Sequence, residues 1–132
     1  MGSFSDYLEG LILDEWFGGV PAAVPDTYYI ALGTGDADDS TFTELDAGGY
    51  VRFPLANTKD NWTTAGSAGG SVATKVEVPY GPATTRWGDV TSYAVYDIDD
   101  NQYGAGEFDE PHRVLSGESG RFPAGTIVVS LD

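Results

Sequence analysis

Cysteine is absent from this 132-residue chain, and its absence excludes several kinds of site. Without thiols there are no disulfides, no cysteine nucleophile, and no cysteine ligands for zinc or an iron–sulfur cluster. The redox compartment stays undecided. Apolar residues make up 41 % of the chain and aromatics 13 %, which is enough to build a packed core without covalent cross-links.

Basic residues are also scarce. Six lysines and arginines oppose 21 acidic residues, which gives a formal net charge of −15, so we expect no nucleic-acid partner. The acidity has three physical interpretations: solubility through self-repulsion, adaptation to high salt, or complementarity to a basic partner. Adaptation to salt is favoured, because the acidic residues are spread along the whole chain and do not form one tail.

Long apolar runs are missing as well. No stretch approaches the roughly 20 residues of a membrane span, and the N-terminus lacks the basic and apolar regions of an export signal. We therefore expect no membrane partner and no recognisable export. The length fits one domain of about 100–200 residues, so the expected organisation is a single domain, residues 1–132.

Residues 4–17 show the apolar spacing of an amphipathic α-helix, with apolar side chains at three- and four-residue steps and acidic or small residues between them. Ser3 is a start signal, and Gly18-Gly19 is a glycine stop. We expect this helix to be largely buried, either over an open end of its own β core or against a neighbouring subunit. Leu11→Asp should then cost about 3–5 kcal/mol.

From residue 27 onward the chain consists of short strand-like runs separated by Gly, Pro, Asn and Asp. The expected strands cover residues 27–32, 50–55, 71–78, 93–98, 103–108, 112–115 and 126–131. No further helical period is present to build parallel crossovers. The sequence therefore predicts a mainly β fold, a β-sandwich or jelly-roll-like domain over about residues 27–132 with one N-terminal amphipathic α-helix.

Two long loops are expected, at residues 33–49 and 57–70. The second is low in apolar residues except for Trp62. This composition predicts either a mobile segment or one pinned by a single aromatic anchor.

Signals of catalysis are weak. The one histidine, His112, has no cysteine or second histidine to share a metal, and no GxSxG nucleophile elbow is present. The 18 glycines form neither a GxGxxG nor a GxxxxGK[ST] phosphate loop. We expect His112 to be a surface or strand-start residue, and we expect neither enzymatic activity nor a cofactor.

Two acidic clusters are candidate calcium sites, because carboxylates at close spacing are the oxygen ligands that Ca²⁺ prefers. The candidate ligands are Asp36, Asp38, Asp97, Asp99 and Asp100. The second cluster opens like an EF-hand loop, but Gln102 stands where that loop requires glycine, and Phe108 where it requires glutamate. The EF-hand interpretation therefore fails. Solvated loop acids are favoured over an irregular calcium site.

Five segments occur in a characteristic order: SFSDYLEGLILDEWFGG (3–19), PDTYYIALGTG (25–35), GGYVR (48–52), WGDVTSYAVYD (87–97) and FPAGTIVVSLD (122–132). Together they resemble a family of small tailed-phage virion proteins, often labelled tail fibre or capsid cement proteins. The resemblance spans nearly the whole chain and implies no catalytic residue. The excess of acidic residues departs from the usual pattern of the family. Such an excess is expected for a protein from a virus of a salty habitat.

The resemblance implies a structural protein of the virion. Our first hypothesis is a capsid decoration (cement) subunit that binds the major capsid protein lattice and itself, as a homotrimer; the second is a tail or tail-fibre subunit. A carbohydrate-binding module that uses Trp62 and Trp87 as stacking platforms represents a different class. The candidate interface residues are Phe4, Tyr7, Leu11, Trp16 and Trp62.

Overall fold

The computed structural model describes residues 3–37, 41–63 and 70–130. Within these residues it contains one helix and nine strands. The helix is α1 (Asp6–Gly18). The strands are β1 (Ser3–Phe4), β2 (Thr27–Gly33), β3 (Phe53–Ala56), β4 (Ser71–Ala73), β5 (Val78–Tyr80), β6 (Gly88–Tyr96), β7 (Gln102–Val114), β8 (Gly120–Phe122) and β9 (Val128–Ser130).

The strands form two sheets. A seven-stranded sheet has the order β3-β2-β6-β7-β1-β9-β4, and a two-stranded sheet pairs β5 with β8. All pairings are antiparallel except β1 with β9, which is parallel. The prediction of a mainly β fold with one N-terminal helix is confirmed.

Several strands differ from the expected ones. Strands β1 and β8 were not predicted, and β6 begins five residues before the expected strand 93–98. The predicted strands 103–108 and 112–115 are one strand, β7, which pairs with β6 across a register shift between Val90 and Ser92. Such an irregularity lets a long strand bend without ending. Conversely, the predicted strand 71–78 is divided into β4 and β5, which belong to different sheets.

The core lies between the two sheets. Tyr93, Phe122 and Ile127 are among its fully buried side chains. The small sheet is tied to the large one by the Tyr80 hydroxyl, which donates a 2.8 Å hydrogen bond to the carbonyl of Ile30, and the ring of Phe122 stacks on Phe108. Burial of these aromatic rings stabilises the fold in two ways, because it removes apolar area from water and places the rings in favourable pairs.

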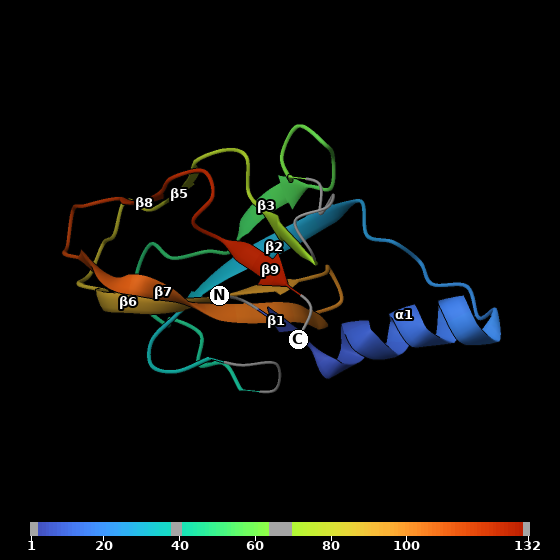
Figure 1. The fold of residues 1–132 in the computed structure, drawn as a ribbon. Coiled ribbons are helices and arrows are strands. Elements are labelled where there is room, and N and C mark those ends of the chain that lie inside the picture. The colour runs from blue at the N-terminus through green and yellow to red at the C-terminus, as the bar shows by residue number, and fades with distance from the viewer. Residues whose placement is uncertain (1–2, 38–40, 64–69, 131–132) are drawn as a thin grey trace.

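Helix α1 projects away from the two sheets (Figure 1). None of its residues is buried. The prediction that the helix is largely buried over an open end of its own β core is therefore wrong, whereas burial against a neighbouring subunit stays a prediction. Its apolar residues are also not confined to one face, contrary to the amphipathic pattern that was predicted. The short β1 that precedes the helix enters the sheet between β7 and β9 and directs the helix outward. No helix among the described residues is long and apolar enough to cross a membrane.

Candidate functional site

The base of helix α1 is firmly attached to the β body. The N-cap is Ser5, not the predicted Ser3, and its hydroxyl accepts a 3.1 Å hydrogen bond from the amide of Leu8 while donating one to the carbonyl of Gln102. The Ser5 amide donates to the carbonyl of Tyr103, and the ring of Tyr7 meets that of Tyr103 edge to face at 5.6 Å. The direction of the helix is therefore set by strand β7.

The far end of the helix is closed by a glycine cap. Gly19 has φ of 66°, a left-handed conformation that suits glycine, and its amide donates to the carbonyl of Asp14. The Glu15 carboxylate then accepts a 2.9 Å hydrogen bond from the amide of Ala22. This bond holds the returning segment beside the helix. We call residues 6–25, the helix and this segment, the helical arm.

The outer half of the helical arm carries large apolar side chains exposed to solvent. Trp16 is 76 % exposed and Phe17 is 86 % exposed. Leu13, Val20 and Val24 are exposed as well. Isolated exposed apolar residues are ordinary, but a contiguous group of this kind marks a surface that contacts another molecule.

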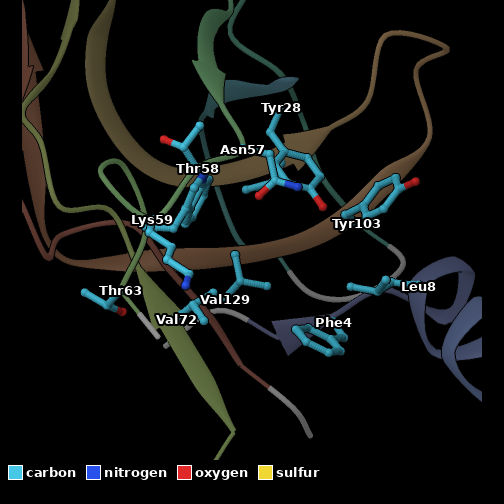
Figure 2. A pocket seen from close by; sticks show the side chains of 12 residues that line it. Phe4, Leu8, Tyr28, Asn57, Thr58, Lys59, Thr63, Val72, Tyr103 and Val129 are labelled. Atoms are coloured by element: carbon cyan, nitrogen blue, oxygen red, sulfur yellow. The ribbon is translucent and has the colours of Figure 1, made fainter. Parts of the chain in front are cut away.

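A pocket of about 350 Å³ lies at the base of the helical arm. Figure 2 shows Phe4 from β1, Leu8 from α1 and Tyr103 from β7 on one side, with Asn57, Thr58 and Lys59 across from them. Trp62, Val72, Val95 and Val129 complete the apolar lining, together with Tyr28 and Thr63. The pocket thus joins the start of the chain to the long loop after β3.

Trp62 anchors that loop. The residue is 9 % exposed, and its ring meets Tyr28 edge to face at 5.9 Å. The expected aromatic anchor of the loop is therefore confirmed. The indole Nε1 is buried, and in the part of the chain that the structure describes it has no hydrogen-bond partner. An unpaired buried donor of this kind is unfavourable.

The five candidate interface residues fall into three groups. Phe4 and Trp62 line the pocket. Tyr7 and Leu11 are partly exposed near the base of the arm, and Trp16 stands at its far end. Because Trp62 is buried, it presents little surface to a partner, whereas Trp16 presents most of its ring.

The charges are arranged unevenly around this site. Arg52, Arg113 and Arg121 form ion pairs with carboxylates of their own chain. Both lysines, by contrast, lack an ion pair among the described residues. They lie together: the Lys75 ammonium donates a 3.0 Å hydrogen bond to the carbonyl of Lys59, which lines the pocket. One lysine therefore lines the pocket of this acidic protein and a second lies beside it.

The acidic residues of the β6–β7 turn build the turn itself. One carboxylate oxygen of Asp97 accepts hydrogen bonds from the amides of Asp99 and Asn101 at 2.9 and 2.8 Å, and the other accepts one from Asn101 Nδ2 at 3.0 Å. Although desolvation acts to raise the pKa of Asp97, these bonds hold it below its ordinary value. Burial, and then the nearby Asp97 carboxylate, raises the pKa of Tyr103 to about 12.

The calcium candidates are therefore not assembled into one site. Asp97 is committed to the turn, Asp100 pairs with Arg52, and Asp36 is exposed on a different loop. Asp38 lies outside the described residues. In the described ranges no group of three or more histidine or acidic side chains is placed to hold a metal ion.

The aromatic and histidine candidates for other chemistry serve the core. Trp87 is 5 % exposed, and its Nε1 donates a 2.8 Å hydrogen bond to the carbonyl of Gly48. With Trp62 also buried, neither tryptophan offers an open ring face to a sugar, so the stacking platforms expected for a carbohydrate-binding module are wrong. The ring of His112 packs against Phe108 and Phe122.

The motifs behind the family resemblance meet in space. The Trp87 to Gly48 bond joins WGDVTSYAVYD to GGYVR, and Tyr50 of GGYVR contacts Trp87 edge to face at 5.9 Å. These motifs maintain the fold. By contrast, nothing in the sequence indicated that the pocket-lining residues form a pocket, because they come from seven separate segments.

The motif residues serve packing, and the β body carries a projecting arm. This arrangement fits a structural role, with which a comparison with protein families agrees. A family model matches residues 3–130, and the chain is accordingly a structural protein of a phage virion. The family is described as Gp80, podophage GP4 fiber I protein gp80, and this chain belongs to it. A search of curated proteins finds no match.

Proposed function

We propose that this chain is a subunit of a phage tail fibre and that it assembles there with copies of itself. The family match over residues 3–130 carries the proposal, since the family is described as a fibre protein. The exposed helical arm supports it, because an apolar surface of this kind is normally covered in an assembly. The proposed role is structural and needs no catalytic activity.

The self-association that we propose is a homotrimer. A rigid β body can bury apolar patches between copies while its loops remain free at the ends. Closed cyclic assemblies are the common form of homo-oligomers, and they leave no unsatisfied patch at either end. The capsid-decoration role that the sequence favoured needs the same self-association and, in addition, binding to the major capsid protein. Both roles therefore require the apolar surface of the helical arm to be covered by another molecule.

Location on the particle tests the proposal. Antibody-gold labelling of intact virions, or a cryo-EM map of the whole particle, should place the chain on fibres at the tail. Quantitative mass spectrometry should give a small copy number per virion. Density on the head lattice, with hundreds of copies, would refute the fibre role and establish capsid decoration.

The acidity of the chain is proposed to be an adaptation to high salt. With a formal net charge of −15, like charges repel across the fold unless salt screens them. The four ion pairs that three arginines form among the described residues offset only part of this repulsion. The basic-partner interpretation predicts the opposite response, because salt weakens pairing with a basic protein.

A further inference from the structure

The helical arm and the pocket are chemically complementary. The arm ends in Trp16 and Phe17, two aromatic rings that are mostly exposed. The pocket, of about 350 Å³, is lined mainly by apolar and aromatic side chains, and its size is at the lower end of cavities that take small ligands. An aromatic side chain would bury apolar area there on both partners.

The charges near the two surfaces are also complementary. The arm carries Asp14 and Glu15 directly before the aromatic pair, and the last turn of the helix contains no basic residue. A helix C-terminus has partial negative charge and free carbonyl groups. Lys59 lines the pocket, and Lys75 lies beside Lys59. Neither lysine has an ion pair among the residues that the structure describes.

Lys59 is the basic side chain that lines the pocket. In Figure 2 the side chain of Lys59 extends over the pocket towards Val72 and Val129, so its ammonium group is close to any segment that enters.

The arm cannot fill the pocket of its own chain. Leu8, in the first turns of the helix, already forms part of the pocket wall. Trp16 is eight residues further along, which at a rise of 1.5 Å per residue places it about 12 Å away along a straight helix. The end of the helix points away from the β body (Figure 1). A contact between these two surfaces must therefore join two molecules.

We propose that the Trp16–Phe17 end of the helical arm of one copy docks into the Lys59-rimmed pocket of a second copy. Asp14 and Glu15 then face Lys59 and Lys75. The contact is head to tail, so a rotation that closes on itself produces a ring such as the proposed trimer. This inference rests on the proposed assembly of the chain with itself, and names the surfaces that perform it.

A mixing experiment separates this contact from other modes of association. Trp16→Asp removes the arm contact, and Lys59→Glu with Lys75→Glu reverses the charge of the pocket rim. Each variant alone should associate at least tenfold more weakly than the wild type in sedimentation velocity. Mixed together they should form a 1:1 heterodimer, because one supplies an intact arm and the other an intact pocket.

The matched control is Val51→Asp, which places the same charge at an apolar residue that is 75 % exposed and lies outside the arm and the pocket lining. It should associate like the wild type. Circular dichroism should show that all variants are folded, as expected for exposed positions. A mixture that remains monomeric, or a wild type that is monomeric in solution, would overturn the proposal.

A second measurement exploits the absence of cysteine from the chain. Phe17→Cys and Thr63→Cys are introduced in separate copies, mixed and oxidised. A disulfide between the two variants is the expected product, at least tenfold more abundant than that formed by Thr63→Cys mixed with Val51→Cys. Dimers of Phe17→Cys alone as the main product would show that two helices pair with each other, which would contradict docking in the pocket.

These experiments use the isolated full-length chain and are independent of location on the virion. If variants fail to behave as expected while gold labelling still marks the fibres, only the arm-in-pocket contact is wrong. If labelling marks the head while the mixing experiment succeeds, the contact stands and the fibre role falls.

Discussion

Replacing Arg52 by methionine should destabilise the fold by about 2–3 kcal/mol. The guanidinium group binds Glu44 through two bonds, Nη2 to Oε1 at 2.8 Å and Nε to Oε2 at 2.9 Å. It also donates to Asp100 at 2.5 Å and lies 4.0 Å from the ring centroid of Tyr96. One side chain thus links β3, the preceding loop, the β6–β7 turn and β6.

The magnitude follows from the geometry and the partial burial of this network. Arg52 and Glu44 are 27 % and 30 % exposed, and hydrogen bonds to charged groups contribute about 1.5–3 kcal/mol. The contact with Tyr96 adds about 0.5–1 kcal/mol. Some of the loss is recovered, because water and the Tyr50 hydroxyl, 2.5 Å from Glu44, still solvate the carboxylate.

The control is Arg113→Met. Arg113 Nε lies 3.4 Å from Asp89 Oδ1, and the two side chains are 66 % and 52 % exposed. A single exposed pair of this kind contributes about 0–0.5 kcal/mol. Urea unfolding followed by circular dichroism measures both variants against the wild type. Equal free energies of unfolding for the two variants, or an Arg52→Met effect below about 0.5 kcal/mol, would refute this reasoning.

Three further predictions concern the helix, salt and acid. Leu11→Asp should cost about 1 kcal/mol or less in the isolated chain, well below the value expected for a buried helix, because no residue of α1 is buried; thermal unfolding checks this, and a loss of several kcal/mol would contradict it. The melting temperature of the isolated protein should rise between about 0.1 and 3 M NaCl, and a flat or falling curve would favour a basic partner. Asp97 has a pKa below its ordinary value of 3.8, so its contribution is complete above that pH and is lost as the pH falls through the lowered pKa. The stability difference between wild type and Asp97→Asn should therefore be constant near neutral pH and shrink below about pH 4, and a difference that grows in acid would show that the sign is wrong.

The local patterns of the sequence determined the elements of this protein. Alternating runs predicted most strands, and the spacing of residues 4–17 predicted a helix that the structure has at Asp6–Gly18. The order of the motifs identified a phage virion family, which the family match confirms. These features could be predicted because periodicity and turn residues act over a few neighbours, and because the motifs maintain the fold wherever it occurs.

Only the tertiary structure decided what those elements face. The sequence of α1 is the same whether the helix covers a core or leaves it, and its direction follows from the pairing of Ser3 and Phe4 with distant strands. The pocket likewise depends on long-range pairing, because it joins Phe4, Lys59 and Val129. Periodicity describes one face of one segment, whereas the partner of that face depends on contacts between residues far apart in the chain.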